Sequence, residues 1–311
     1  VEVPEKVESI VCVGVGALRY TCYVGAQDLV VGVEDYEVTR GLDRLYNYVN
    51  HGKFKDLPII GTNGVPYAEE IISAAPQVIV MSKSANADAD DLQAQTGTPV
   101  VVIPGSDTTL DDNAYETIRI LGQLYSMEDR AEELTTYLKG VQEDLDSRTK
   151  NIPDSDKPSV YVAGVSFRGL HGFEGTEAGY GPFELIHANN LANTTGQTGA
   201  FNIDVEQVLS WDPDVIFLCL GHGISRQFVD SHEIKPECRI IDLGNDFRLD
   251  GEYAGRHFVY GLCESAREVV KEAHDVANPG CFATAIQLAT LPLAAAGLIN
   301  DEIHVTAITG S

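Results

Sequence analysis

Runs of apolar, β-branched residues recur along residues 1–110 and alternate with segments of helical periodicity. The apolar runs are SIVCVGVG, LVVGVE, PQVIVMS and TPVVVIPG, and the segment YAEEIISAA between two of them has the spacing of a short amphipathic helix. Short buried strands that alternate with helices are typical of a parallel sheet covered by helices on both faces. The pattern therefore predicts an α/β fold for this part of the chain.

The pattern becomes helical from Asn113 to Lys150, and the segment SMEDRAEELTTYLKGVQEDLDSRTK opens on Ser126 and Asp129, a spacing similar to a capping box. A helix over this segment would be about 35 Å long. The helix-breaking segment NIPDSDKP follows, and SVYVAGV begins a second series of strands. We expect an N-terminal lobe over residues 1–112, connecting helices over 113–150 and a second lobe that begins at 151.

An internal repeat relates the two lobes. The segments YAEEIISAAPQVIVM and DVEQVLSWDPDVIFL align without a gap, each with a short amphipathic helix, a proline and a buried strand. Glu69 and Glu206 precede Pro76 and Pro213 at the same spacing. The repeat predicts two lobes of similar construction, each with a parallel sheet, joined by the long helix.

Composition and charge exclude several partners. The chain has 21 Lys and Arg against 47 Asp and Glu, a formal net charge of −26, which disfavours a nucleic-acid backbone or an anionic membrane as partner. We find no apolar run of about 18 residues, and the start VEVPEKVESIV lacks the features of a signal peptide. Membrane association is expected only through an anchor missing from this sequence or through a membrane partner.

The six cysteines form no CxxC pair. Neither a structural zinc site nor a disulfide scaffold is indicated, and no metal site is expected. The cysteines are Cys12, Cys22, Cys219, Cys238, Cys263 and Cys281.

Residues 1–218 resemble the substrate-binding proteins of ABC importers for iron siderophores, haem and cobalamin. The resemblance rests on VGAQDLVVGVED, LPIIGTNGVPYAEEIISAAPQVIVMS, the long helix, VSFRGLHGFEGTEAGYGPFELIHANNLA and FNIDVEQVLSWDPDVIF, in this order. It implies two lobes joined by a rigid helix, an anionic metal chelate bound between them, and an extracytoplasmic location. The implied partner is an importer permease, and no cofactor is expected because the chelate is cargo.

The resemblance also implies that one acid on each lobe docks onto basic residues of the permease. By position these acids are Glu69 and Glu206. An alternative interpretation is that both side chains only complement the dipoles of their helices.

Arginines and aromatic residues near the ends of strands are the candidate ligand contacts. Arginine offers a planar fork of donors for anionic oxygens, and rings stack on flat ligand faces. Each of them could equally be a solvated loop arginine or a packed tyrosine. The candidates are Arg19, Tyr20, Arg44, Tyr46, Phe167, Arg168 and Tyr180.

The same region imitates a dinucleotide-binding fingerprint. Gly14 and Gly16 follow a predicted strand, and Glu34 follows at about the spacing of a ribose-binding acid. Arg19 occupies the position of the third glycine, where its side chain would crowd the pyrophosphate. We therefore favour a turn at the ligand site over a nucleotide cradle.

Residues 219–311 resemble a different family, N-acetyl-gamma-glutamyl-phosphate reductase. The segments FLCLGHGISRQF, RIIDLGNDFRLDGEY, VYGLCE, VANPGCFATAIQLATLPLAAAGLI and IHVTAITGS carry the resemblance. It implies a cysteine thiolate that attacks an acyl phosphate, and NADP as the reductant. By position Cys281 is the nucleophile, Arg248 holds an anionic substrate group and His222 lies in a turn near the nicotinamide.

Local sequence supports Cys281, because Asn278-Pro279-Gly280 forms a turn before a helix whose positive end would lower the pKa of the thiol. A cysteine beside a glycine is otherwise usually structural. Cys219, Cys238 and Cys263 are expected to be buried apolar residues. The glycine-rich NADP loop of the reductase is missing, since binding-protein sequence stands in its place, so Cys281 is expected to form an adduct at most.

Three functions remain open. The leading one is an importer substrate-binding protein in which a Rossmann-like reductase fragment completes or replaces the second lobe, with neither family complete. The alternatives are a cytoplasmic, NADP-dependent reductase of arginine biosynthesis, inactive as it stands, and a composite without function. The junction falls between Phe217 and Leu220, and we expect RIIDL to extend the sheet beside VIFLCL.

Overall fold

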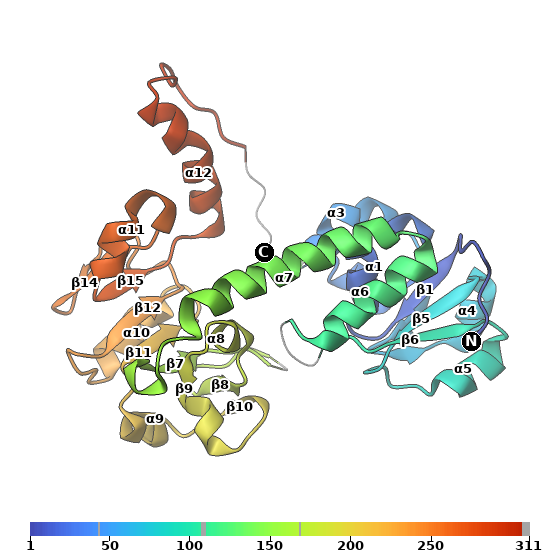
Figure 1. Ribbon diagram of the computed structural model, residues 1–311, viewed down its shortest axis with the longest axis horizontal. Helices are drawn as coiled ribbons and strands as arrows, with labels where there is room; N and C mark the ends of the chain where they lie inside the picture. Colours follow the sequence, from blue (N-terminus) through green and yellow to red (C-terminus); the bar gives the residue numbers. More distant parts are fainter. Residues whose placement is uncertain (43, 107–109, 168, 307–311) are drawn as a thin grey trace. The chain divides into compact units, whose positions relative to one another are not determined.

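The computed structural model describes residues 1–42, 44–106, 110–167 and 169–306 (Figure 1). The described chain divides into two compact units, unit 1 over Val1–Asp144 and unit 2 over residues 145–306. Each unit is built around a largely parallel β-sheet, as the sequence predicts for the two lobes. Within the described ranges, no helix has the length and apolar character needed to cross a membrane.

The sheet of unit 1 has the strand order β4-β3-β2-β1-β5-β6. Its strands are parallel except for β4, which runs antiparallel to β3. The four apolar runs predicted as strands form β1, β2, β5 and β6, whereas β3 and β4 were not predicted. The strands are β1 Ile10–Val13, β2 Val30–Glu34, β3 Ile59–Thr62, β4 Val65–Pro66, β5 Val78–Ser82 and β6 Val100–Ile103.

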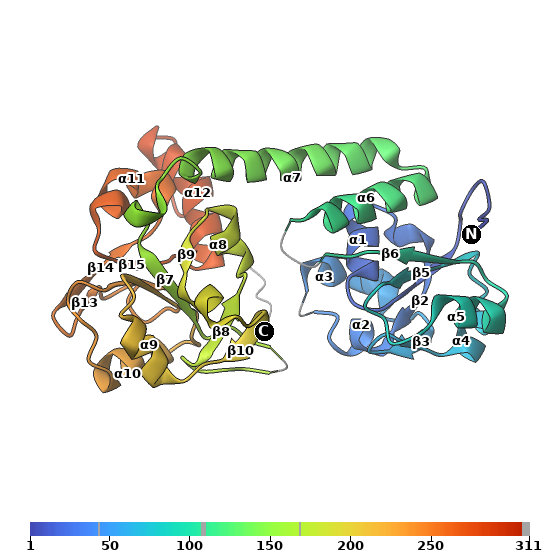
Figure 2. The ribbon, with the colours of Figure 1, turned by 60° about the horizontal axis from the view of Figure 1, so that its bottom comes forward.

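Two helical layers cover this sheet (Figure 2). Alternate residues of β1 point to opposite faces, so Ile10 and Cys12 pack with α1, α3 and α6, whereas Val11 and Val13 pack with α4 and α5. A sheet buried on both faces explains why its strands are apolar throughout. The helices are α1 Ala17–Val24, the 3₁₀ turn η1 Gln27–Leu29, α2 Asp35–Thr39, α3 Leu45–Phe54, α4 Ala68–Ala74, α5 Ala89–Thr96 and α6 Asp112–Tyr125.

The segment 113–150 forms two helices, α6 and α7 (Glu128–Thr149). The predicted capping box at Ser126 is wrong. Ser126 ends α6 in a left-handed conformation with a φ of 55°, and its N–H and that of Met127 donate to the last carbonyls of α6. The helical pattern continues through this break, which is why the sequence does not reveal it. With 22 residues, α7 is about 33 Å long.

The main sheet of unit 2 has the order β13-β14-β15-β12-β11-β7-β9. Its strands are parallel except for the antiparallel pair β13 and β14. A separate antiparallel pair, β8 and β10, lies outside it. The strands are β7 Ser159–Ala163, β8 Gly175–Ala178, β9 Asn189–Asn190, β10 Gly199–Asn202, β11 Val215–Leu218, β12 Arg239–Asp242, β13 Glu252–Tyr253, β14 Arg256–Tyr260 and β15 Asp275–Ala277.

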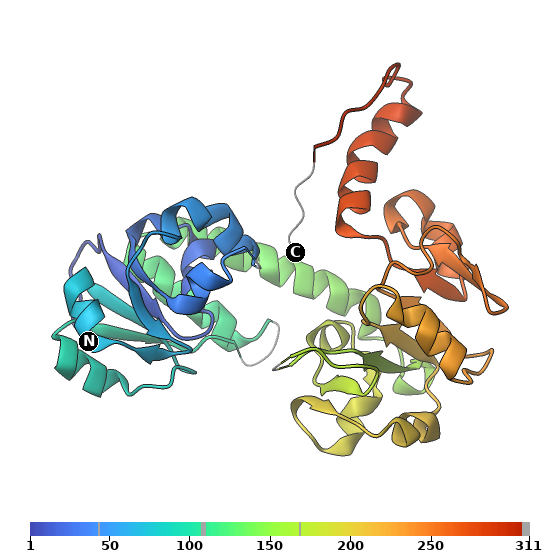
Figure 3. The ribbon, with the colours of Figure 1, turned by 180° about the vertical axis from the view of Figure 1, so that it is seen from behind.

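Helices α9 and α10 contribute to the core on one face of this sheet, and α8 packs on the other. Helix α12 projects from the rest of unit 2 (Figures 1 and 3). The helices are the 3₁₀ turn η2 Asp154–Asp156, α8 Gly181–Leu185, the 3₁₀ turn η3 Leu191–Thr195, α9 Val205–Trp211, α10 Ile224–Ser231, α11 Cys263–Glu272 and α12 Cys281–Ala295.

The two family segments meet inside one sheet and one core. Strand β12 pairs with β11 in parallel, from Val215 opposite Arg239 to Leu218 opposite Asp242, as predicted for RIIDL. The core on one face combines Tyr161 and Val208 from the first segment with Phe228, Phe247 and Phe258 from the second. Residues on both sides of the junction therefore stabilise the same body.

The internal repeat corresponds to two matching structural units. Helices α4 and α9 each have seven residues, each ends in a left-handed residue (Ala75 with φ 49°, Asp212 with φ 50°), and each is followed by a buried strand. Asp204 caps α9, because its side chain accepts a hydrogen bond from the N–H of Glu206.

Phe228→Ala tests whether the shared core makes unit 2 one cooperative body. Phe228 is buried and stacks on Phe173 with ring centroids 4.4 Å apart. We expect a loss of about 3 to 5 kcal/mol in the free energy of unfolding. Urea unfolding followed by the fluorescence of Trp211, which packs against the same core, measures it.

The control is Leu249→Ala at a fully exposed position, which should leave the transition unchanged. An unshifted Trp211 transition in Phe228→Ala would show that the two segments unfold independently.

Candidate functional site

The carboxyl ends of β1 and β5 mark the expected ligand position of unit 1. In the sheet, β1 lies between β2, the next strand in the chain, and β5, which comes later in the sequence. The strand order therefore changes direction at β1. Ligands of open α/β sheets bind at such a switch point, beyond the carboxyl ends of the strands. The turn 14–16 and the start of α1 lie directly after β1. Gly14 has a φ of 85°, and a Cβ there would lie 3.0 Å from that of Ala85, so the close approach requires glycine.

Glu34 holds this edge together from within. It ends β2 with only 2% of its surface exposed, and its carboxylate accepts the N–H groups of Gly14 (2.8 Å) and Gly64 (2.6 Å). Burial raises the pKa of Glu34, and these hydrogen bonds oppose the rise. Because both oxygens face backbone donors, Glu34 is not placed as a ribose acceptor, which argues against the dinucleotide interpretation.

Arg19 lies in the first turn of α1, as the sequence analysis proposed for a ligand contact. It is half-buried, and its guanidinium carbon lies 5.2 Å from the ring centre of Tyr20. Its Nε is buried and has no hydrogen-bond partner among the described residues. Tyr20 itself is buried, which raises the pKa of its hydroxyl. Arg19 therefore retains a donor, whereas Tyr20 is mainly a packed ring.

Arg44 and Tyr46 lie near the end of β2, around Glu37. The hydroxyl of Tyr46 donates to the buried carboxylate of Glu37 at 2.8 Å, and burial raises the pKa of Glu37. Arg44 lies over the ring of Tyr36, with its guanidinium carbon 5.1 Å from the ring centre. Its Nη1 is buried without a partner in the described chain. The hydroxyl of Tyr46 is thus held by an internal hydrogen bond. Arg44 keeps a donor, Nη1, that no described residue accepts.

Further unsatisfied polar atoms lie close to Arg44 in sequence. Asn47 Oδ1 and His51 Nδ1 are buried on the same face of α3, one turn apart, and Asp35 Oδ1 is buried at the start of α2; none has a hydrogen-bond partner within the described ranges. Buried polar atoms are normally paired. Sequence analysis missed these three residues, although the spacing of Asn47 and His51 was an available signal.

Unit 2 places its candidate contacts differently. Phe167 follows β7 and stacks on His171 at 3.9 Å, and Arg168 lies outside the described residues. Tyr180 precedes α8 and packs edge-on against Phe183 at 5.0 Å, and burial raises the pKa of its hydroxyl. Tyr180 is therefore largely a packing residue.

Glu69 and Glu206 occupy the same position in the two repeats. Each is the second residue of its helix, α4 or α9, and each is exposed. The structure thus leaves both carboxylates accessible. It is equally compatible with a favourable interaction with the helix dipole.

Arg248 joins two turns at the carboxyl edge of unit 2. Its Nε donates to the carbonyl of Asn278 (2.7 Å) and its Nη2 to that of Leu243 (2.9 Å). Its guanidinium is so close to Gly280 that a Cβ there would lie 2.7 Å from Nη1. Cys281 follows as the exposed first residue of α12. The structure therefore brings Arg248 next to the turn that carries Cys281.

His222 lies in an exposed turn before α10. Two N–H groups at the start of this helix are already occupied: those of Gly223 (2.6 Å), the residue before the helix, and of Arg226 (3.0 Å) donate to the carboxylate of Asp246. An anion at this helix end would have to displace Asp246.

The remaining cysteines divide by exposure. Cys238 is buried and Cys219 is half-buried, and burial raises the pKa of each thiol to about 11. The expectation that Cys263 is buried is wrong, because it is the exposed first residue of α11, a helix that has no buried residue.

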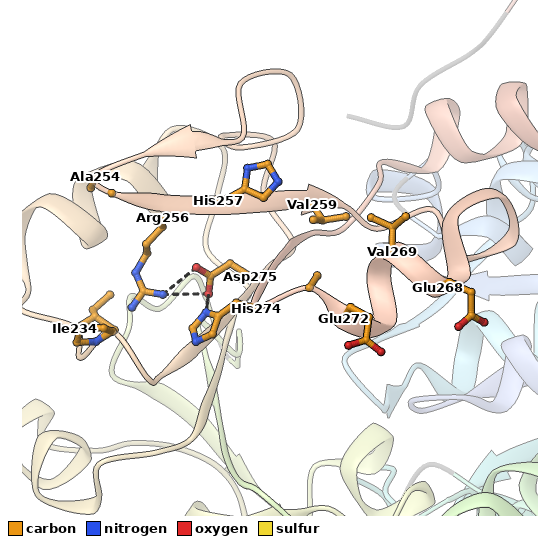
Figure 4. A pocket seen from close by; sticks show the side chains of 13 residues that line it. Ile234, Ala254, Arg256, His257, Val259, Glu268, Val269, Glu272, His274 and Asp275 are labelled. Carbon is orange, nitrogen blue, oxygen red and sulfur yellow. Dashed lines mark hydrogen bonds and ion pairs between the residues drawn. The ribbon is translucent and has the colours of Figure 1, made fainter.

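A cavity of about 800 Å³ lies at the amino ends of β14 and β15 (Figure 4). Its polar floor is an ion pair in which Arg256 Nη1 lies 3.0 Å from Asp275. Asp275 also accepts the N–H of Ile240 at 2.8 Å, and Arg256 also donates to the carbonyls of Cys238 and Lys235. Arg256 and Asp275 are thus paired, and the cavity lies at the edge opposite to the usual ligand position, so we do not take it as the ligand site.

Among the described residues, no group of three or more His, Cys, Asp or Glu side chains is placed to hold a metal ion.

The chain has two α/β units, and each contains a largely parallel sheet and one copy of the helix-strand repeat. Helix α7 crosses the boundary between the units. This architecture is that of a bilobal binding protein of the α/β class. The chain belongs to the periplasmic binding protein family, whose model matches residues 10–234.

Solved structures with the same fold are solute-binding proteins. An ABC transporter solute-binding protein from Sulfurospirillum deleyianum has a TM-score of 0.56 at 19% identity, over 79% of this chain and 78% of that chain. The molybdate-binding periplasmic protein of Haemophilus influenzae gives 0.55 at 19%, over 70% of each chain. The haem-binding periplasmic protein of Vibrio cholerae gives 0.50 at 18%, over 68% and 75%.

Curated relatives point to the second family. N-acetyl-gamma-glutamyl-phosphate reductase of Flavobacterium johnsoniae is 53% identical over 100 residues, which are 32% of this chain and 31% of that protein. The enzyme of Christiangramia forsetii is 45% identical over 113 residues, 36% and 35% of the two chains. The chain spans about a third of the length of these relatives. Matches to two unrelated families are those of a composite chain.

Asp242→Asn tests a buried charge at the carboxyl edge of unit 2. Asp242 is fully buried; its Oδ1 accepts from the Ser225 hydroxyl and the Gly244 N–H, and its Oδ2 has no partner in the described part of the chain. Burial raises the pKa of Asp242 above its ordinary value. The folded state therefore gains stability as pH falls through the raised pKa, and the ionised form destabilises it at neutral pH.

We expect Asp242→Asn to raise the free energy of unfolding by about 1 to 2 kcal/mol at neutral pH, and the gain to vanish below about pH 4. Urea unfolding at several pH values measures it, with exposed Asp250→Asn as control. A variant that is less stable than the parent at neutral pH would contradict the assignment.

Proposed function

We propose that this protein binds an anionic solute outside the cytoplasmic membrane and delivers it to an ABC importer. Membership in the periplasmic binding protein family supports this role. That the ligand is anionic is inferred from the hydrogen bonding of Arg19 and Arg44. In a chain with 47 acids and 21 bases, both keep a buried guanidinium nitrogen without a partner among the described residues.

The buried acids Glu34 and Glu37 do not pair with the unpartnered nitrogens of these arginines. The carboxylates of Glu34 and Glu37 are buried and accept hydrogen bonds from Gly14, Gly64, Tyr46 and Asn47. They are thus held by the protein's own donors. An anionic oxygen would supply the acceptors that the arginine donors lack.

We infer that the solute is a metal chelate or metal oxyanion. The resemblance of residues 1–218 implies an iron or cobalt chelate of the siderophore, haem or cobalamin type. Two structural relatives are a periplasmic haem-binding protein and a molybdate-binding one. Tyr20 and Tyr36 lie under the two guanidinium groups and help to hold them in place.

Glu69 and Glu206 are proposed to dock onto the importer. Their equivalent, exposed positions on α4 and α9 support a pair of contacts made by the two repeats.

The second candidate is the reductase, supported by 53% identity to that enzyme over 100 residues and by the proximity of Arg248 to the turn before Cys281. NADP would be its cofactor, but the residues do not fit it. Asp246 already accepts the N–H groups of Gly223 and Arg226 at the start of α10, and Glu34 accepts those of Gly14 and Gly64. We expect no phosphate-dependent NADP reduction with the semialdehyde; turnover abolished by Cys281→Ser would favour the enzyme instead.

Arg19→Gln and Arg44→Gln test the ligand site. Because bound ligand stabilises the folded state, ferric siderophore, haem, cobalamin or molybdate should raise the melting temperature of the parent. Each substitution should weaken binding by roughly 10- to 100-fold, since hydrogen bonds to charged groups contribute about 1.5 to 3 kcal/mol. Isothermal titration calorimetry measures the affinity.

The matched control is Arg119→Gln, whose guanidinium pairs with Glu116 on the surface of α6. It should bind like the parent. If all three variants bind the ligand with the affinity of the parent, Arg19 and Arg44 do not belong to the ligand site.

Glu69→Arg and Glu206→Arg test docking. Both variants should bind the ligand normally but lose transport in proteoliposomes that contain the cognate importer, because each reverses a charge at the permease contact. Glu70→Arg on the same helix, also exposed, is the control and should keep transport. Normal transport by the double variant would leave only the helix-dipole role.

A further inference from the structure

Most lysines and arginines of unit 1 are engaged by the protein itself. The chain has a formal net charge of −26, so acidic partners are plentiful. Even so, Arg19, Arg44 and Lys83 form no ion pair with any acid that the structure describes. The cations of unit 1 that do pair with an acid include Lys6, Lys53, Lys55, Arg119 and Arg130.

Lys83 lies in a tight turn that follows β5 directly. The N–H of Ala85 donates to the carbonyl of Ser82 at 2.9 Å, so Lys83 and Ser84 are the two central residues of a β-turn. The hydroxyls of Ser82 and Ser84 are hydrogen-bonded to each other at 2.9 Å, which fixes the turn from within. Lys83 is exposed, and its ammonium group has no partner among the described residues.

The turn after β1 brings Lys83 and Arg19 to the same place. On one side of this turn, a Cβ added to Gly14 would lie 3.0 Å from that of Ala85, so the Lys83 turn packs directly against it. On the other side, a Cβ added to Gly16 would lie 3.6 Å from Nη2 of Arg19, so the guanidinium group lies beside the same turn. The strands β1 and β5, which end in these two turns, are parallel neighbours.

Hydrogen bonds connect Arg44 to this turn as well. Its guanidinium carbon lies 5.1 Å from the ring centre of Tyr36. The hydroxyl of Tyr36 donates to Oε2 of Glu34 at 3.3 Å, and the same oxygen accepts the N–H of Gly14 at 2.8 Å. Cations without an acidic partner therefore lie near the carboxyl ends of three neighbouring strands, β2, β1 and β5.

We propose that Lys83 is a third cationic contact of the solute and that, together with Arg19 and Arg44, it makes the site selective for multiply charged anions. The proposal rests on the proposed function, which places the ligand at this edge of the sheet. The attraction between an anion and a group of cations grows with the charge of the anion. A solute with several negative charges is therefore favoured over one of similar shape with fewer.

Lysine and arginine contribute differently to such a site. Arg19 and Arg44 are half-buried, and a guanidinium group is a planar fork that fixes the orientation of a ligand. Lys83 is exposed at the centre of a turn, and its ammonium group is a compact charge on a flexible stem. Lys83 therefore attracts the solute as it approaches, and it acts on the rate of association as well as on the affinity.

Matched anions test the charge selectivity. Molybdate is a dianion and perrhenate a monoanion of the same tetrahedral shape, and a ferric tris-catecholate is anionic whereas a ferric tris-hydroxamate is neutral. The parent should bind the more highly charged member of a pair more tightly. Lys83→Gln should weaken the binding of that member by roughly three- to fivefold, the range of an exposed ion pair, and should narrow the preference. Isothermal titration calorimetry measures both affinities.

Two further variants separate the charge of Lys83 from other effects. Lys83→Arg keeps the charge and should retain most of the affinity and the preference. Lys55→Gln removes a charge that is paired with Asp56 elsewhere on unit 1, and it should bind like the parent. Stopped-flow association at increasing salt should show a slower rate and a weaker salt dependence for Lys83→Gln than for Lys55→Gln.

The outcomes distinguish this proposal from the proposed function. If Lys83→Gln binds both anions like the parent while Arg19→Gln weakens binding, Lys83 is a solvated surface residue and only this proposal is overturned. An equal loss for both members of a pair, or an equal loss in Lys83→Arg, would show that the turn has a purely structural role and would also overturn it. If the parent binds none of these anions, the proposed function fails and this proposal fails with it.

Discussion

Unit 2 depends on the parallel pairing of strand β11 with its two neighbours. This strand forms parallel pairs with β7 on one side and β12 on the other, and its alternate residues enter two different cores. Phe217 packs on the face that α8 covers, and Leu218 packs on the face that α9 and α10 cover. Because these residues lie at the junction of the two families, hydrogen bonding and burial both continue across it. A parallel strand buried on both faces requires only apolar side chains and a partner of the right direction, which both families provide.

The excess of acids in this chain makes the unpartnered nitrogens of Arg19 and Arg44 unusual. An acidic chain offers many partners for a guanidinium, and Arg119 and Arg256 find theirs in Glu116 and Asp275. Arg44 lies instead near Glu37, whose carboxylate already accepts hydrogen bonds from Tyr46 and Asn47. Glu34 accepts the N–H groups of Gly14 and Gly64 and so holds the turn after β1 to Gly64.

Helix α12 is apolar enough for a helix that is buried on most sides. In this structure it is half-buried along one face only, and its large apolar side chains on the other sides are exposed.

The sequence alone determined the elements whose pattern is local. Apolar runs predicted β1, β2, β5, β6, β7, β11 and β12, because strands buried on both faces must be apolar throughout, and the repeat predicted the matching helices α4 and α9. It also supplied both family resemblances. The tertiary structure decided what depends on neighbours distant in sequence. The helical pattern runs through Ser126, where the chain in fact turns, and nothing local distinguishes Arg44, which keeps a free donor, from Tyr46, whose hydroxyl is held by Glu37. Whether a polar side chain remains available is settled by which partners the fold brings to it, and that information lies in three dimensions.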